Sequence, residues 1–363
     1  MKIAILAPEN DNHTAPVKWA LERVGYQVFC WSGLGWPPER QASISLLDNL
    51  KVRLGSRELE TGDVVWIRRP EPPCLNPGVS EADRKFAQGE YRWFSDSLRS
   101  LLEWLPVRCI NRYSASRMIR NKSVQLVLAK SCGLKVPATL MSNAPGPIRG
   151  YLQQSAGPSI CKGFFPHIWR NSADQSVAVT ETFQLSEDIL PADEILTYAP
   201  AIYQQMIAKQ FDVRMVLLGN AVYSVALYNP RESIDWRQDV TQGLVRAESL
   251  ATPNPIKQQV LAFAQKSGIV FGSFDFAVDH NGGWWFLEVN EQGQFLWLDD
   301  LNPELRLQEK FLAFLTSPEG TPAHEIEGRA AFFPSWQEYL DSPAANQPVA
   351  EQPHPIAEFM SLE

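Results

Sequence analysis

The chain has 363 residues, and its 45% hydrophobic and 20% charged residues are typical of a globular protein with room for two or three domains. A formal net charge of -8 argues against general binding to nucleic acid, which needs a basic face. The five cysteines are scattered and form no Cys-x-x-Cys pair, so they predict reduced thiols and neither a disulfide framework nor a zinc site.

No stretch reaches the roughly 18 apolar residues of a membrane span, and the apolar run within residues 1–7 is too short for a signal peptide. We therefore expect a cytoplasmic protein with no membrane partner and no nucleic-acid partner. Because the chain is acidic overall, any polyanionic ligand must meet cations that cluster locally.

The first part of the chain predicts an α/β unit. Residues 2–7 favour a buried strand, residues 15–24 a helix and residues 26–31 a second strand, which we expect to be parallel to the first. Residues 63–68 predict a further strand that ends at two adjacent arginines, Arg68 and Arg69. Such a pair is more often a solvated edge than an anion contact.

Two helices follow in the prediction. Ser80 and Asp83 resemble a capping box, and the apolar residues from there to Leu105 recur at helical spacing, which predicts a long helix packed on the core. Residues 116–130 predict another helix, which carries Lys122. On a helix surface a lysine is usually a solvated side chain.

Residues 159–162 predict a short strand with Lys162 at its end, and residues 163–176 predict an irregular lid or loop that lacks the glycines of a P-loop. Residues 201–207 predict a strand that leads into a connection. A mobile joint between two units would suit that position.

A hairpin is predicted for residues 211–227, with Gly219 and Asn220 at its turn. Strand alternation places Asp212 and Arg214 on one face. The aspartate would either neutralise the arginine or hold its guanidinium toward an anion. Residues 255–268 then predict a helix.

A second hairpin is predicted where two apolar runs flank Asn281 and Gly282, the strongest short-range hairpin signal. If its loop is residues 279–282, Asp275 pairs with Phe286, and Asp275, Glu288 and Asn290 share one face. A loop one residue longer would put Asp275 on the face opposite to Glu288.

These three side chains supply the oxygen ligands that Mg²⁺ prefers. An ionised Glu288 within an apolar strand is costly unless a cation or hydrogen bonds offset its desolvation. The alternative is a carboxylate paired with a nearby arginine or placed at a strand end, and the hairpin alone does not decide between the two.

Together, in order and spacing, short segments resemble the ATP-grasp superfamily and, within it, the graspetide synthetases, the microviridin-type enzymes that close ester and amide rings in ribosomal peptides. The resemblance covers about residues 1–300. It rests on residues 10–14 (NDNHT), 65–70 (VWIRRP), 121–122 (NK), 133–137 (GLKVP), 203–205 (YQQ), 212–214 (DVR), 235–237 (DWR), 286–290 (FLEVN) and 293–294 (GQ).

The resemblance implies an α/β, or α+β, ATP-grasp fold that holds ATP between two α+β units. The expected divisions are an N-terminal pre-ATP-grasp strand–helix–strand domain at 1–110, a central lid domain at 111–205, a C-terminal domain with the magnesium site at 206–315 and a Pro-rich tail at 316–363.

The resemblance also implies roles for single residues. Lys122 and Lys162 match lysines that contact the ATP phosphates, and Gln204 and Gln205 match a hinge that contacts adenine. The magnesium ligands match Asp275, Glu288 and Asn290, and the positions near the γ-phosphate and the acceptor carboxylate match Arg214 and Arg237, with Asp212 beside them.

The implied activity is ATP-dependent phosphorylation of Asp or Glu side chains in a precursor peptide, which has a leader and an acidic core. Ring closure with Thr, Ser or Lys side chains follows. Members of the family are often homodimers. One departure is Glu291, because the family commonly has proline after the metal-binding asparagine.

Two other functions remain open from the sequence. One is intermolecular ligation, in which a free amino acid is added to a peptide or protein carboxylate. The other is a silent ATP-grasp module that binds a partner without catalysis, although the implied metal ligands and both lysines are present.

The tail after Leu315 is rich in Pro, Ala and Glu, and we expect most of it to be loosely ordered. Residues 331–340 are the exception, because their aromatic residues recur at helical spacing. We favour a helix that covers the core. The alternative is that Phe332 and Phe333 mimic the aromatic leader motif of some precursors and dock in cis on the leader site.

Overall fold

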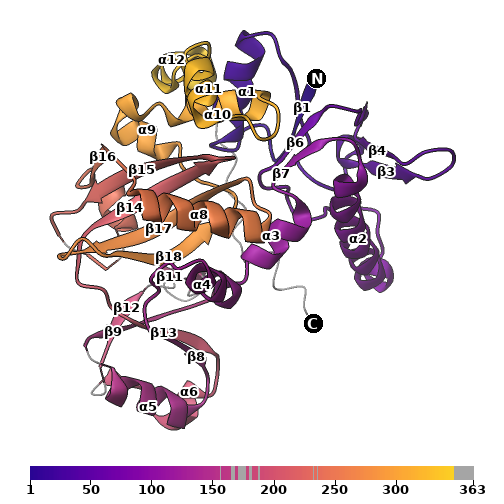
Figure 1. Ribbon diagram of the computed structural model, residues 1–363. Coiled ribbons are helices and arrows are strands. Elements are labelled where there is room, and N and C mark those ends of the chain that lie inside the picture. Colours follow the sequence, from indigo (N-terminus) through magenta and orange to yellow (C-terminus); the bar gives the residue numbers. More distant parts are fainter. Residues whose placement is uncertain are drawn as a thin grey trace.

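The computed structural model describes residues 1–155, 157–164, 168–170, 177–179, 182–186, 189–231, 233–234 and 236–346. The molecule has three parts: an N-terminal α/β unit, a large antiparallel sheet with flanking helices, and a smaller sheet. The large sheet lies between the other two parts (Figure 1). Among the described residues, none of the helices could span a lipid bilayer.

The N-terminal unit is built on a parallel sheet of order β2-β1-β6-β7, which confirms the predicted parallel pairing of the first two strands. Its strands are β1 (Lys2–Leu6), β2 (Gln27–Cys30), β6 (Val64–Ile67) and β7 (Arg108–Ile110). A separate antiparallel sheet contains β3 (Ala42–Ser45), β4 (Lys51–Leu54) and β5 (Arg57–Glu58).

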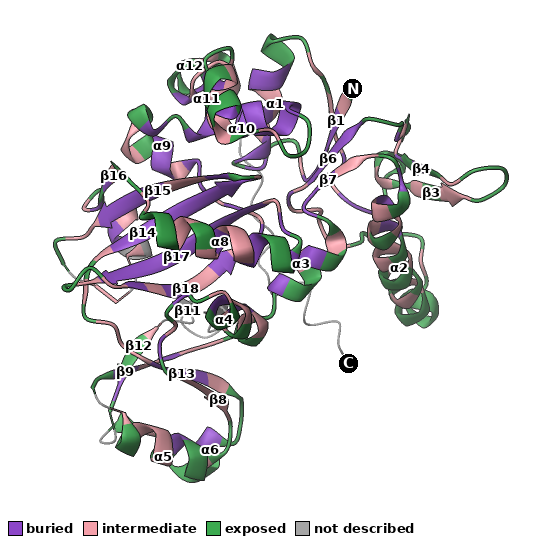
Figure 2. Cartoon of the chain, viewed as in Figure 1, coloured by how far each residue is buried: buried purple, intermediate pink, exposed green. Residues whose placement is uncertain are grey.

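The long helix α2 (Glu81–Leu101) begins where the capping signal placed it, since the Ser80 side chain accepts a hydrogen bond from the Asp83 backbone N–H. Its packing differs from the prediction. Within the helix only Leu98 is buried, while Phe86 and Trp93 are exposed. The helix therefore touches the core through its C-terminal end and projects away from it (Figure 2).

One helix was predicted for residues 116–130, but the structure has two, α3 (Tyr113–Ile119) and α4 (Lys122–Ser131). The break lies at Asn121, whose side-chain oxygen accepts the backbone N–H groups of Ser123 and Val124. Asparagine competes well for such a capping position. Lys122 is consequently the first residue of a helix and not a mid-helix residue.

The smaller sheet is antiparallel, with the order β12-β9-β13-β8. Its apolar cluster includes Ile148 and Tyr203 and packs under α5 (Pro145–Gln154). The strands are β8 (Thr139–Ser142), β9 (Ser159–Lys162), β12 (Phe183–Leu185) and β13 (Ala201–Gln205). Of the irregular loop predicted for residues 163–176, residues 165–167 and 171–176 lie outside the described residues, and the strand β10 (Ile168–Arg170) pairs with β11 (Val177–Val179).

The large sheet has the order β16-β15-β14-β17-β18 and is antiparallel. The hairpin β14–β15 turns at Gly219 and Asn220, as predicted. Alternate residues of β14 point to opposite faces of the sheet and pack in two different hydrophobic clusters. Met215 packs in the cluster under α8, and Val216 packs in the cluster around α10. The strands are β14 (Lys209–Leu218), β15 (Ala221–Tyr228), β16 (Arg246–Leu250), β17 (Phe271–Asp279) and β18 (Trp284–Asn290).

The register of β17 and β18 differs from the prediction. The loop is one residue longer, residues 279–283, so Val278 pairs with Trp284 and Phe276 with Phe286. A β-bulge then takes up one extra residue of β18, and Asp275 pairs with Glu288. The two irregularities cancel, so Asp275 and Glu288 still share a face.

The remaining helices lie around these sheets. Helix α10 lies between the N-terminal sheet and the large sheet, where its Phe311 ring meets the Trp66 ring edge-on at 4.9 Å between centroids. The helices are α1 (Thr14–Arg23), α6 (Asp193–Leu196), α7 (Arg237–Thr241), α8 (Asn254–Ser267), α9 (Trp297–Leu301), α10 (Leu307–Thr316), α11 (Ala323–Ala330) and α12 (Trp336–Leu340).

The expectation of a loosely ordered tail is wrong for residues 317–330 and 341–346, whereas residues 331–340, the expected exception, contain the predicted helix. Helices α11 and α12 pack on the core through Ile326, Trp336 and Tyr339, and the Tyr339 ring meets Trp19 of α1 at 5.5 Å. The composition suggested loose order, but a few large aromatic residues bury enough apolar surface to order a Pro-rich segment. The favoured alternative, a helix that covers the core, matches this packing.

We predict that Trp336→Ala lowers the free energy of unfolding by about 3 kcal/mol, because it empties a buried site and removes the indole hydrogen bond to Asp300. The control is Phe332→Ala four residues earlier, where a side chain that is 78% exposed should cost less than about 0.5 kcal/mol. Urea unfolding measures both. Equal small losses would mean that α12 is not part of the folded core.

Candidate active site

The centre of the site is the shared face of β17 and β18. Asp275 and Glu288 lie directly opposite each other, and Asn290 pairs with Ser273 one step along the same face. Asp275 is buried, whereas Glu288 is partly open to solvent. Two carboxylates and an amide thus line one patch of the sheet.

Arg214 on the neighbouring strand β14 is bound to this patch. Its Nη1 donates to both carboxylate oxygens of Asp275, at 2.6 and 2.8 Å, and its Nη2 donates to the carbonyls of Gly293 and Gln294, at 2.7 and 3.1 Å. The two strands place these residues opposite each other. Charge-assisted contacts of this kind are short and strong, so the guanidinium is fixed over the face.

Asp212 shares the face of Arg214 but has a different partner. Its carboxylate lies 2.7 Å from Lys209 Nζ, and the carboxylate that neutralises Arg214 is Asp275. The alternative in which Asp212 neutralises Arg214 is therefore not what the structure shows. Alternation along β14 alone could not reveal this, because the decisive pairing is with β17.

Lys122 reaches the same patch from helix α4. Its Nζ lies 3.3 Å from Glu288 Oε2. The helix is held against β18 by Gln125, which donates to the Val289 carbonyl at 3.0 Å and accepts the Val289 N–H at 2.9 Å. Gln125 carried no signal in the sequence, because a polar helix residue usually faces solvent.

The smaller sheet holds a second group of predicted residues. Lys162 Nζ donates to Gln204 Oε1 at 3.0 Å, and Gln204 Nε2 donates to Thr139 Oγ1 at 2.9 Å. Gln204 is buried, while Gln205 ends β13 and is partly open to solvent. The structure thus brings Lys162 and Gln204 together, separately from the pair of Lys122 and Glu288.

The polar loop that leads to α7 is described only in part. Asp235 lies outside the described residues, and for Arg237 the structure gives the backbone, at the start of α7, and not the side chain. Trp236 stacks on Trp297 with 4.9 Å between ring centroids. The role of Arg237 stays a prediction.

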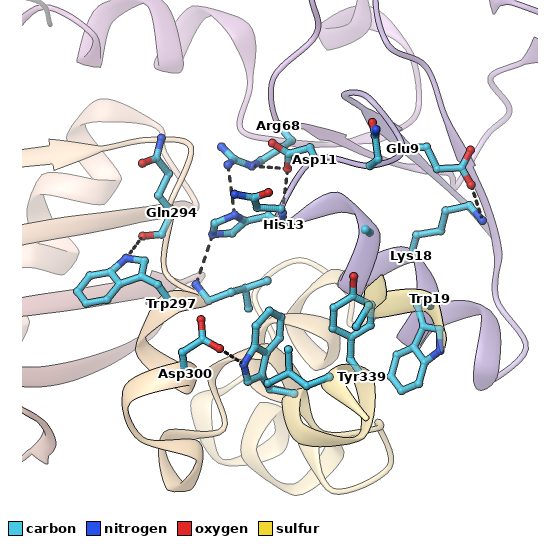
Figure 3. Close-up of a pocket in the computed structure, with 18 of the residues that line it drawn as sticks. Glu9, Asp11, His13, Lys18, Trp19, Arg68, Gln294, Trp297, Asp300 and Tyr339 are labelled. Carbon is cyan, nitrogen blue, oxygen red and sulfur yellow. Dashed lines mark hydrogen bonds and ion pairs between the residues drawn. The ribbon is translucent and has the colours of Figure 1, made fainter. Parts of the chain in front are cut away.

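A buried cluster next to the site had no assigned role in the sequence, although residues 10–14 and Arg68 belonged to the motifs. Asp11 Oδ1 accepts the backbone N–H groups of His13 and Thr14 and lies 3.3 Å from Arg68 Nε (Figure 3). The expectation of a solvated edge is wrong for Arg68, whose side chain is 0% exposed. Burial lowers the pKa of this guanidinium to about 10.

His13 connects this cluster to the chain after β18. Its Nε2 accepts the backbone N–H groups of Phe295 and Leu296, at 3.0 and 3.3 Å. Burial, and next the charge of Arg68, hold its pKa well below the ordinary value. A neutral ring is needed because the nitrogen must keep a lone pair to accept.

Glu291, at the position where the resemblance expects proline, is also held. Its carboxylate accepts from Arg120 Nε at 2.9 Å, and its carbonyl accepts from Asn111 Nδ2 at 2.9 Å. The extra carboxylate is thus neutralised by an arginine next to Lys122. This departure from the family pattern adds no unpaired charge to the site.

The donor set fits a hard divalent cation. Carboxylates and an amide oxygen are the ligands that Mg²⁺ takes, with water and substrate phosphates in its remaining positions. Within the described part of the chain no three His, Cys, Asp or Glu side chains group together as a metal site. Two carboxylates with Asn290, each carboxylate already beside a cation, match a metal that is bound together with a phosphate ligand.

The comparisons with known proteins establish the fold. No family model matches the sequence, and no curated protein matches it. A RiPP-associated ATP-grasp ligase from Chryseobacterium gregarium, in complex with ADP and a leader and core peptide, is 23% identical, with a TM-score of 0.75 over 88% of this chain and 98% of that chain.

Two further solved structures are similar to this chain in fold. The macrocyclase MdnC from Microcystis aeruginosa, bound with precursor peptide MdnA, is 21% identical, with a TM-score of 0.70 over 87% of this chain and 99% of that one. The ATP-grasp ligase PsnB, complexed with a phosphomimetic variant of a minimal precursor, Mg and ADP, is 20% identical, with a TM-score of 0.66 over 87% and 97%. The chain therefore has the ATP-grasp fold.

We predict that His13 makes stability depend on pH. Below the ordinary pKa of 6.5 the unfolded chain binds a proton that the folded chain refuses, so the stability present above this pH is lost as the pH falls. The His13→Gln variant should lose up to about 1.4 kcal/mol less than the wild type over the first pH unit below 6.5. Urea unfolding at each pH gives the slopes, and identical slopes would contradict a neutral His13.

Proposed function

We propose that the protein is an ATP-dependent carboxylate ligase that phosphorylates Asp or Glu side chains of a ribosomal precursor peptide and joins them to Thr, Ser or Lys side chains as intramolecular esters or amides. The observation that carries this proposal is the convergence of Arg214 and Lys122 on the carboxylates of Asp275 and Glu288. The ATP-grasp fold, and neighbours of that fold described with ADP, Mg and precursor peptides, support it.

Asp275, Glu288 and Asn290 are the proposed magnesium ligands. Lys122 would bind phosphate oxygens from the first turn of α4, where the helix N-terminus also favours an anion. When bound, Mg-ATP supplies the phosphoryl group that turns a carboxylate into an acyl phosphate, the form that an amine or hydroxyl can attack.

The chain's own residues mainly position the bound groups and neutralise their negative charge. Arg214 holds its charge over the face through contacts to Asp275 and to two backbone carbonyls, so it needs no rearrangement when negative charge develops nearby. Lys122 can exchange its contact with Glu288 for phosphate oxygens, since the lysine stem is flexible. Arg237 is proposed to meet the acceptor carboxylate.

The smaller sheet is proposed to hold the nucleotide from the other side. Lys162 would contact phosphate, and Gln204 and Gln205 would present the adenine-binding edge. Gln204 keeps Lys162 in place through the hydrogen bond between them, and Thr139 fixes the amide of Gln204 in turn. Such supporting contacts limit the freedom of a phosphate-binding lysine.

The test is the intact mass of an acidic peptide that contains Thr, Ser and Lys and is encoded beside this gene, after incubation with the protein, ATP and Mg²⁺. Loss of one water for each ring is the expected result. Glu288→Gln should abolish that loss, because it removes a charged metal ligand. The matched control, Glu304→Gln, makes the same change at an exposed residue of the C-terminal region and should keep the activity.

A gain in mass equal to an added amino acid would instead indicate intermolecular ligation. No change in mass and no release of ADP with such peptides would contradict the proposed enzyme, and would leave a binding module. Activity that survives Glu288→Gln would contradict the assigned metal site while leaving the reaction in place.

A further inference from the structure

A cavity of about 630 Å³ lies between helix α1, the chain after β18 and the C-terminal helices. Aromatic side chains form much of its wall: Trp19 from α1, Trp297 from α9, and Trp336 and Tyr339 from α12. In the close-up, Tyr339 and Asp300 lie on one side of the opening, opposite His13 and Asp11 (Figure 3). The tail helices thus complete a cavity that the first 315 residues alone would leave open.

The charged groups that line the cavity are Glu9, Asp11, Glu22 and Asp300, with Lys18 and Arg68. Three of the four carboxylates already have a cation. Lys18 lies 3.1 Å from Glu9 and 2.8 Å from Glu22, and Arg68 lies 3.3 Å from Asp11. His13 adds no charge, because burial keeps its pKa low.

Asp300 is the exception. One oxygen accepts the indole N–H of Trp336 at 2.7 Å, and across the described residues the carboxylate has no cationic partner. Asp300 is exposed at the mouth of the cavity, and partial desolvation of its carboxylate raises its pKa. A carboxylate between aromatic side chains, with one oxygen left over, is suited to a cation from outside.

The cavity wall and the proposed nucleotide site share a hydrogen-bond acceptor. The carbonyl of Gln294 accepts from Arg214 Nη2 at 3.1 Å and from Trp297 Nε1 at 2.8 Å. Arg214 belongs to the metal-binding face, and Trp297 belongs to the cavity wall. The cavity wall is therefore adjacent to the metal-binding face.

We propose that this cavity binds an ammonium side chain, a lysine, of the substrate peptide, with Asp300 as its counter-ion and the aromatic side chains along its methylene stem. This inference rests on the proposed function for its peptide and on the cavity for its chemistry. An ammonium fits better than a guanidinium, because a guanidinium prefers both carboxylate oxygens and one is already bonded to Trp336.

The test uses two probes that differ only in charge, Nα-acetyl-lysine methylamide and Nα-acetyl-norleucine methylamide. They are titrated without nucleotide into the full-length protein labelled with 5-fluorotryptophan, and ¹⁹F NMR follows Trp297 and Trp336. We expect both signals to shift and saturate with the lysine probe. The norleucine probe should bind at least about tenfold more weakly.

Asp300→Asn is the informative variant, since its amide oxygen can still accept the indole N–H of Trp336. It should weaken binding of the lysine probe about tenfold. Asp48→Asn, the same change at an exposed residue outside the cavity, should bind like the wild type. Glu288→Gln should also leave probe binding unchanged, which separates this inference from the ligase activity.

Equal affinities for the two probes, or no shift of either tryptophan signal, would overturn the inference, and so would unchanged binding in Asp300→Asn. The comparison of probes in the wild type needs no variant, so an unstable Asp300→Asn protein would not prevent the decision. A failure of the proposed ligase reaction would appear in the mass experiment and not here.

Discussion

The ion pair between Arg214 and Asp275 organises this molecule. It joins two central strands of the large sheet, and the same guanidinium ties the carbonyls of Gly293 and Gln294 to the sheet. A buried pair of this kind adds little net stability, but losing one partner would leave the other charge buried without compensation. The pair therefore fixes one geometry for the carboxylate face, for the chain after β18 and, through Trp297, for the wall of the cavity.

The N-terminal unit is joined to this centre by polar contacts as well as by its core. His13 accepts from the backbone after β18, and Arg120 binds Glu291. Asn111 donates to the carbonyl of Phe271 and accepts its N–H at the start of β17. Each contact crosses more than 150 residues of sequence. The site is thus assembled from segments that are far apart in the chain, so local sequence patterns do not show which residues meet.

Much of the fold could be predicted from local patterns. The strand–helix–strand start and the 211–227 hairpin were visible because alternation, helical spacing and turn residues agree there. The break at Asn121 was missed, since a capping asparagine inside an apolar pattern looks like a surface residue. The order of residues 317–330 was missed, because their Pro-rich composition does not show that Ile326 of α11 is buried in the core.

The candidate site could likewise be predicted only in part. The shared face of Asp275 and Glu288 was predicted, but from a register that is wrong. The longer loop and the β-bulge have opposite effects on which face of the sheet a residue occupies, so they cancel. No sequence pattern indicates a bulge at that place. Partners across the sheet, such as Asp275 for Arg214 and Glu288 for Lys122, depend on tertiary packing, and so does the burial of Arg68. The resemblance supplied candidate residues, and the structure supplies their partners.

We propose that the β17–β18 face binds a magnesium nucleotide. Calorimetric titration of ADP in the presence of Mg²⁺ tests it most directly, with the wild type, Asp275→Asn and Glu304→Gln compared. We expect the wild type and Glu304→Gln to bind alike and Asp275→Asn to bind at least about tenfold more weakly, with all binding reduced when Mg²⁺ is removed. Equal affinity in Asp275→Asn and the wild type, or affinity that does not depend on Mg²⁺, would contradict it.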